Sequence, residues 1–260
     1  MPSAARRLIN WAAAFEDGAI IRAAFFGLLT ATAVILYLDY TDMMARQPAT
    51  GSAPDLQPIL PAFDPTVPAG KPGPKVTTPV EKLRQPLVVQ LVSGGVLDLT
   101  GSIDPGAAAR VAAEIAAHGE YIKTVALDSP GGAVADALAI GRLIRDKGFD
   151  TSVAAGALCA SSCPLIFAGG RERTATDQSA IGVHQIYAAA PAGSLTSQLQ
   201  AAGNAMSEAQ TLTAQISRYL TSMGVADEVW LRALETPPDR LTYFSGDELK
   251  RLNLATRLSK

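Results

Sequence analysis

An uninterrupted apolar run near the N-terminus is the feature that most constrains this chain. Residues 19–38 read AIIRAAFFGLLTATAVILYL, and a helix needs about 20 such residues to cross a bilayer. The one charged residue of the run, Arg22, lies near its start, where a long side chain can reach the membrane interface. We therefore predict a transmembrane signal anchor over residues 19–38, after a short N-terminus of residues 1–18.

The charges on the two sides of this run predict its orientation. Arg6 and Arg7 precede it, whereas Asp39 and Asp42 follow it. Because positive charge stays in the cytoplasm, the N-terminus is expected to be cytoplasmic and the rest of the chain to lie across the membrane. A cleaved signal peptide is the alternative, but no clear small-x-small cleavage site follows the apolar run.

Prolines recur through the next segment, residues 39–86, and most densely from Gln47 to Pro86. Proline lacks a backbone donor and fixes φ, so such a segment favours an extended chain over a helix or a sheet. We predict a Pro-rich linker over residues 39–86 and a folded domain over residues 87–260.

The pattern of the folded domain alternates between short apolar strands and amphipathic helices. Strands are expected at 87–92, 96–101, 122–128 and 151–156, and helices at 104–119, 133–147 and 161–168, the first of them with Asp104 as its N-cap. Alternation at this spacing is typical of an α/β fold, in which helices wrap a mainly parallel sheet. In such folds functional groups gather at the carboxyl ends of the strands.

One motif at such a strand end is DSPGG, residues 128–132. It leads from a predicted strand into a predicted helix, whose first turn has no internal acceptors, so the N–H groups of Gly131 and Gly132 are expected to be free. Glycine also allows close approach of the backbone. These donors could hold an oxyanion, although an ordinary strand-to-helix turn is the alternative.

A second motif, GALCASSCPLIFAGG, places Ser161 and Ser162 between Cys159 and Cys163. Downstream, GVHQ places His184 at the end of another probable strand. A single histidine is more often structural than catalytic. Here, however, a serine, a Gly-rich donor loop and a histidine at strand ends make up the nucleophile, oxyanion hole and general base of acyl transfer.

The order DSPGG, CASSCPLIFAGG and GVHQ resembles the proteolytic subunit of the Clp protease and its relatives in the ClpP/crotonase superfamily. The resemblance covers about residues 88–254 and is closer still to bacterial membrane-anchored or periplasmic Clp-like proteins, which carry the Cys-Ala-Ser-x-Cys form. It implies a ClpP/crotonase-like fold and an ATP-independent serine endopeptidase that needs no cofactor. It also implies a bacterial inner-membrane protein with its ClpP-like domain in the periplasm.

The resemblance further implies the role of each site residue. In the resembled family, the spacing between the oxyanion-hole glycine and the nucleophilic serine matches the spacing from Gly132 to Ser161. The resemblance therefore implies that Ser161 is the nucleophile and that His184 is the general base. The backbone N–H groups of Gly132 and Ser162 would form the oxyanion hole. A catalytically silent ClpP-like binding or assembly module is the alternative function, although this chain retains all of these residues.

The third member of the triad is less clearly marked. Asp239, in TPPDRLTYFSG, lies about two residues from the position that the resemblance implies, and Asp227 is the alternative. A third possibility is that backbone or water orients His184. A Ser-Lys dyad is disfavoured, because no lysine occurs between Lys147 and Lys250. Crotonase enzymes bind acyl-CoA, which would be scarce beyond the membrane.

Cys159 and Cys163 are the only two cysteines in the chain. They bracket the expected nucleophile on the side of the membrane where disulfides persist, so we predict a bond between them. Two buried thiols are the alternative, because an ideal helix holds sulfurs four residues apart too far from each other. Two thiols and distant histidines argue against a metal site.

Partners follow from the remaining patterns. Residues 194–223 predict a long amphipathic helix, which in the resembled family mediates ring stacking, so a homo-oligomer through this helix is one expectation and packing on its own domain is another. The formal net charge of −2 and the lack of a Lys/Arg cluster argue against nucleic acid. The expected partners are a peptide or protein substrate and the membrane.

Overall fold

The structure is a computed structural model that describes residues 17–45, 74–186 and 195–259. The chain divides into two compact units, Met1–Asp55 and Leu56–Lys260. Most of the predicted linker and Ser194, the first residue of the helix predicted over 194–223, lie outside the described residues.

The described part of the first unit is a single helix, α2 (Asp17–Ala45). Its stretch Ile21–Thr41 has a mean hydropathy of 1.9 and is long and apolar enough to cross a membrane. The large apolar side chains along it, Phe26 and Leu28 among them, are exposed. The helix extends beyond the predicted span of 19–38 at both ends.

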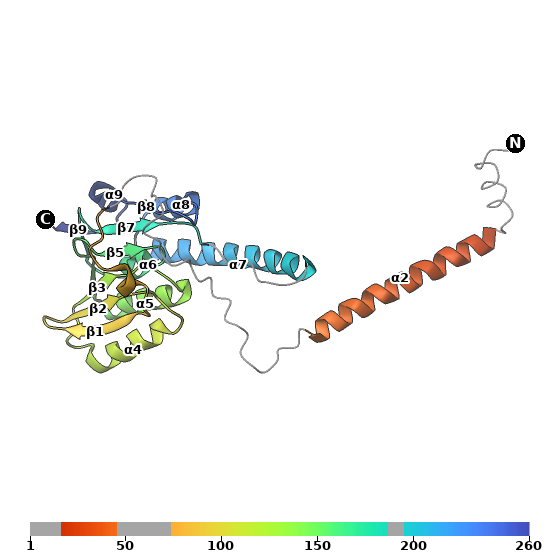
Figure 1. Cartoon of the computed structure of the whole chain (residues 1–260), viewed down its shortest axis with the longest axis horizontal. Helices are drawn as coiled ribbons and strands as arrows, with labels where there is room; N and C mark the ends of the chain where they lie inside the picture. The colour runs from red at the N-terminus through yellow and green to blue at the C-terminus, as the bar shows by residue number, and fades with distance from the viewer. Residues whose placement is uncertain (1–16, 46–73, 187–194, 260) are drawn as a thin grey trace. The chain divides into compact units, whose positions relative to one another are not determined.

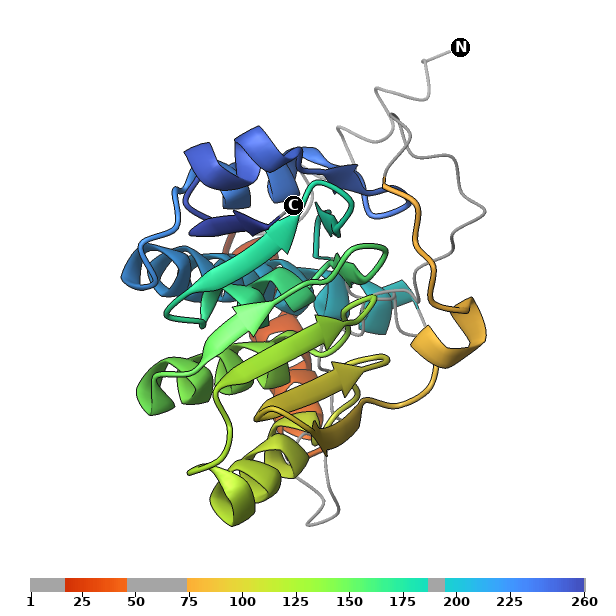
Figure 2. The same cartoon turned by 90° about the vertical axis from the view of Figure 1, so that its left-hand side faces the viewer.

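The second unit contains two sheets (Figure 2). The larger sheet has the order β1-β2-β3-β4-β6-β9, with bounds Val88–Val92, Val96–Thr100, Thr124–Asp128, Asp150–Ser152, Arg173–Thr176 and Arg257–Ser259. Only its β1–β2 pair is antiparallel. The smaller sheet has the order β5-β7-β8, with bounds Leu158–Ala160, Ala180–Val183 and Thr242–Tyr243. The expected mixed α/β architecture with a mainly parallel sheet is thus confirmed.

Helices surround these sheets (Figure 1). They are α3 (Val80–Leu83), α4 (Ala107–His118), α5 (Val134–Lys147), α6 (Cys163–Ala168), α7 (Leu195–Ser222), α8 (Glu228–Glu235) and α9 (Gly246–Arg251). The expected cap at Asp104 was wrong, because α4 begins three residues later. The Asp104 carboxylate instead accepts hydrogen bonds from the Leu87 N–H, at 3.0 Å, and from Arg110.

The pairing of β5 with β7 positions the functional motifs. These strands are parallel, with Ala160 opposite Gly182, so the chain leaves both of them at the same edge. The segment that follows β3 joins them there, because Ser129 forms a parallel bridge with Cys159. Three loops that are distant in sequence therefore begin side by side.

The segment that precedes β1 is also fastened to the domain. The Thr77 N–H donates to the Gly156 carbonyl at 2.9 Å, and the Thr78 hydroxyl donates to the Asp128 carboxylate at 2.5 Å. Leu83 of α3 is buried in a small cluster with Leu158. Part of the segment that the sequence assigned to a linker therefore packs against the strand that leads to Ser161.

Candidate active site

Ser161 occupies a sharp turn between β5 and α6. Its φ is +65°, a left-handed conformation that costs a non-glycine residue about 1–3 kcal/mol. Among the described non-glycine residues only Asn253 shares a positive φ, and asparagine tolerates it more readily. A serine on a strained strand-to-helix turn has the geometry of a nucleophile elbow.

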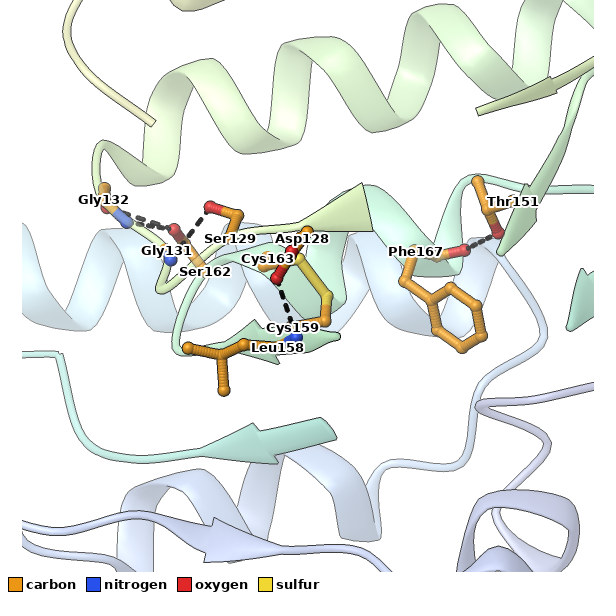
Figure 3. The surroundings of a disulfide bond; sticks show 10 residues. All are labelled: Asp128, Ser129, Gly131, Gly132, Thr151, Leu158, Cys159, Ser162, Cys163 and Phe167. Atoms are coloured by element: carbon orange, nitrogen blue, oxygen red, sulfur yellow. Dashed lines mark hydrogen bonds between the residues drawn. A yellow bond between two sulfur atoms is a disulfide. The ribbon is translucent and has the colours of Figure 1, made fainter. Parts of the chain in front are cut away.

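The Cys159–Cys163 disulfide spans this turn (Figure 3). Its S–S length is 2.03 Å, its Cα atoms are 5.1 Å apart, and both cysteines are fully buried. Cys159 lies in β5 and Cys163 is the first residue of α6. The two sulfurs can meet because the strand and the turn, rather than an ideal helix, separate them. The predicted disulfide is thus confirmed.

Ser161 and His184 line one cavity of about 20 Å³. Ser162 and Trp230 contribute to its wall, and the other lining side chains are apolar, among them Leu165 of α6 and Ile216 of α7. The pocket therefore presents two groups capable of acyl-transfer chemistry within apolar walls.

The described residues contain three buried side-chain polar atoms that have no hydrogen-bond partner: Ser161 Oγ, His184 Nδ1 and Trp230 Nε1. All three residues line this same pocket. Buried polar groups are normally paired, and leaving one unpaired costs about 1–3 kcal/mol. The unsatisfied atoms are thus concentrated where a bound molecule could satisfy them.

The environment of His184 keeps its imidazole neutral. The residue is 8% exposed, and burial lowers its pKa from the ordinary value of 6.5, while the nearby Pro238 carbonyl acts in the opposite direction. Burial disfavours the charged form of an imidazole. At neutral pH the ring can therefore accept a proton.

The structure brings Ser161 and His184 to one pocket, but no hydrogen bond joins their side chains. It does not bring Asp239 to the imidazole. The Asp239 side chain is 65% exposed, and its carboxylate lies 3.4 Å from the Arg240 guanidinium. The alternative carboxylate, Asp227, accepts a hydrogen bond at 3.0 Å from a threonine of α7.

The two glycine N–H donors of the DSPGG loop are already engaged (Figure 3). The Gly132 N–H donates to Ser162 Oγ at 2.9 Å, and this hydroxyl donates back to the Gly132 carbonyl at 3.1 Å. The Gly131 N–H donates to Ser129 Oγ at 3.1 Å. The expectation that both N–H groups are free was wrong, because neighbouring hydroxyls satisfy these buried donors.

The glycines of the loop allow it to lie against the serine. A Cβ at Gly131, where φ is +97°, would lie 2.6 Å from Ser161 Cβ. A Cβ at Gly132, where φ is +146°, would overlap the Ile103 carbonyl. Both positions therefore need glycine for conformation and for space.

Three contributors to the site were not foreseen from the sequence: Ser129, Trp230 and Pro238. Ser129 lies within the DSPGG motif, so the motif itself could have indicated a role for its hydroxyl. Trp230 lies in the acidic first turn of α8, which looks like any amphipathic helix start. Pro238 acts through its carbonyl, which no side-chain pattern reveals. Within the described ranges, no group of three or more His, Cys, Asp or Glu side chains could hold a metal ion.

No protein-family model matches the chain, and no curated protein matches it significantly. Among solved structures, the chain is similar to a single-residue mutant of ClpP1 from Listeria monocytogenes, with 17% sequence identity and a TM-score of 0.49. The similarity covers 64% of this chain and 91% of that one.

The buried disulfide leads to a first prediction. Alkylation of the natively purified and then denatured chain should find no free thiol until a reductant is added. The double variant Cys159→Ala/Cys163→Ala should lose on the order of 2 kcal/mol of unfolding free energy, because the bond closes only a short loop. Alkylation and denaturant unfolding of the full chain in detergent measure both effects. Two thiols that react without reductant would contradict the bond.

Proposed function

We propose that this chain is a serine endopeptidase. The observation that carries the proposal is the strained Ser161, whose unpartnered hydroxyl lines an apolar pocket together with a neutral His184. Strain in a folded protein persists only where the surrounding structure enforces it, and it clusters at functional sites. The resemblance of the three motifs to the Clp proteolytic subunit supports the same assignment.

In the proposed reaction Ser161 Oγ attacks the scissile carbonyl carbon while His184 takes the hydroxyl proton. His184 then gives that proton to the leaving amine as the C–N bond breaks, which leaves an acyl-enzyme. Water, activated by the same imidazole, hydrolyses the ester and restores Ser161. The Ser161–His184 hydrogen bond must form when substrate binds, as is common for catalytic bonds that are open in unliganded sites.

The N–H groups of Gly132 and Ser162 are the proposed oxyanion donors. In the unliganded site Ser162 Oγ accepts the Gly132 N–H, so it occupies the place that an oxyanion would take. Among the described residues the Ser162 N–H has no hydrogen-bond partner. The substrate oxyanion would therefore replace the Ser162 hydroxyl as the acceptor of the Gly132 N–H. It would also accept a second hydrogen bond from the Ser162 N–H.

For the orientation of His184 we favour a Ser-His pair over a triad. The Pro238 carbonyl acts on the imidazole, whereas the Asp239 carboxylate is exposed and lies beside Arg240. A triad with Asp239 would need this loop to turn the carboxylate inward. A backbone carbonyl can orient an imidazole through a hydrogen bond to one ring nitrogen.

A catalytically silent binding module is the second candidate function. It is favoured by one observation, the engagement of the Gly132 N–H by Ser162 Oγ. In such a module this contact would be permanent, and the pocket would hold a peptide without cleaving it.

The proposed setting is the bacterial inner membrane, with α2 as a single-pass anchor and the second unit in the periplasm. The charge asymmetry around residues 19–38 supports this orientation. The proposed partners are a peptide or protein substrate and the membrane, with no nucleic acid. A homo-oligomer through residues 194–223 is also proposed, since side chains such as Met206 on α7 are exposed.

The catalytic assignment predicts that Ser161→Ala and His184→Ala each lower the turnover of an unstructured peptide by on the order of 10³-fold. Ser162→Ala is the comparison variant: it removes a hydroxyl that contacts Gly132 but keeps the proposed backbone N–H donor, so its turnover should change far less than that of Ser161→Ala. A fluorophosphonate probe should label the parent and not Ser161→Ala. If the Ser161→Ala protein cleaves as fast as the parent, the protease proposal fails.

The same peptide assay resolves the orienting group. Asp239→Asn should keep turnover within about threefold of the parent, because its carboxylate is exposed. A loss of 10²-fold or more, with an unchanged melting temperature, would instead place Asp239 in a triad.

The buried imidazole predicts the pH dependence. Only neutral His184 can act as the base, and burial lowers its pKa, so kcat/KM should fall on acidification with a midpoint below the ordinary value of 6.5. Melting temperatures over the same pH range would separate this loss from unfolding. A midpoint above 6.5 would indicate that a carboxylate stabilises the imidazolium, which argues for the triad.

The proposed topology predicts the behaviour of a reporter fused after Lys260. A reporter that is active only in the cytoplasm should be silent, because positive charge precedes the apolar run and the rest of the chain is exported. A fusion to a variant that lacks residues 1–45 is the matched control and should be active. Activity of the full-length fusion would overturn the orientation.

A further inference from the structure

The proposed mechanism uses two of the three unpartnered buried atoms and leaves one, the indole nitrogen of Trp230. This residue belongs to α8 and is 8% exposed. Its Nε1 has no hydrogen-bond partner among the described residues. A buried indole N–H usually finds an acceptor, so its isolation beside the candidate nucleophile needs a physical explanation.

The walls of the pocket do not supply the missing acceptor. Apart from the three residues with catalytic or oxyanion roles and Trp230 itself, every lining side chain is apolar. The hydroxyl of Ser162 is already engaged in both directions with Gly132. An acceptor for Trp230 Nε1 must therefore come from a molecule that enters the pocket.

The size and charge of the pocket limit that molecule. Its volume is about 20 Å³, and a cavity of about 10–15 Å³ holds one water, so the group that enters is about the size of a hydroxymethyl group. No Lys or Arg lines the pocket, so a carboxylate would be buried without a countercharge. The fitting acceptor is thus a small neutral hydroxyl.

We propose that the pocket receives the side chain on the acyl side of the scissile bond, the P1 residue, and that Trp230 Nε1 donates to its hydroxyl oxygen, which selects serine at P1. This inference rests on the proposed peptidase function. The serine hydroxyl can satisfy its own hydrogen on the backbone of the bound peptide, as serine side chains commonly do. Trp230 is then a specificity-determining residue.

The test compares two peptides that differ only at P1, one with serine and the other with 2-aminobutyrate, which replaces the hydroxyl by a methyl group. The full chain in detergent provides kcat/KM for each peptide, and their ratio is the readout. Trp230→Phe keeps an aromatic ring but removes the N–H. We expect the serine/aminobutyrate ratio to fall by on the order of tenfold in Trp230→Phe.

Leu231→Ala is the matched control, because Leu231 neighbours Trp230 on α8 but is 55% exposed. The serine/aminobutyrate ratio of Leu231→Ala should equal that of the parent. If the serine/aminobutyrate ratio differs less than threefold between the parent and Trp230→Phe, the proposal is overturned. The same result is expected if a bound water permanently accepts the indole hydrogen bond. If Trp230→Phe shows no thermal transition, the parent alone decides: a kcat/KM for the serine peptide about tenfold or more above that for the aminobutyrate peptide supports the proposal, and any smaller preference overturns it.

The two proposals fail in different ways. If no peptide is cleaved and the fluorophosphonate does not label Ser161, the peptidase function itself fails. If peptides are cleaved and Ser161 is labelled while the ratio is unaffected by Trp230→Phe, only the role of Trp230 fails.

Discussion

The parallel pairing of β5 with β7 is the constraint on which the candidate site depends. It aligns Ala160 with Gly182, and the Gly182 carbonyl accepts the Ser161 N–H at 2.9 Å. Because the strands run in the same direction, the residues that follow them emerge at one edge. A one-residue change in register would move one of these two side chains to the opposite face of the sheet. The common pocket of Ser161 and His184 is therefore a consequence of backbone hydrogen bonds.

The structure around Ser161 holds a conformation that the residue alone would avoid. Strand pairing fixes one side of the turn, and the disulfide fixes the two flanking residues of β5 and α6. Gly131 has no side chain, so its backbone can lie close against Ser161, where a Cβ would overlap the serine. The strain and the three unpaired polar atoms in the pocket oppose stability, and the buried core of the domain offsets them. Such a local departure from stable packing is what a preorganised site requires.

Much of the fold could be predicted from the sequence, because long apolar and amphipathic patterns mark the strands and helices directly. The strand β5 could not, since Leu158–Ala160 has only three residues and lies next to a helix with the same small apolar composition. The residues of the DSPGG loop were recognised, but the hydrogen bond from Gly132 to Ser162 depends on tertiary proximity across thirty positions. The solvent exposure of Asp239 and the isolation of the Trp230 indole likewise depend on how distant loops pack. The order of the motifs thus identifies the chemical groups of the site. Whether these groups are hydrogen-bonded or exposed depends on the tertiary packing of distant loops.

The contacts of residues 74–86 change where the α/β domain can be truncated. A fragment that begins at Leu87, the boundary suggested by the end of the proline pattern, would lose the hydrogen bond from Thr78 to Asp128. It would also lose Leu83 and so expose the apolar surface of Leu158, in the strand that leads to Ser161. A fragment that begins at Pro74 keeps both contacts. The packed unit is therefore longer than its regular α/β pattern, because residues 74–86 contact β3 and β5.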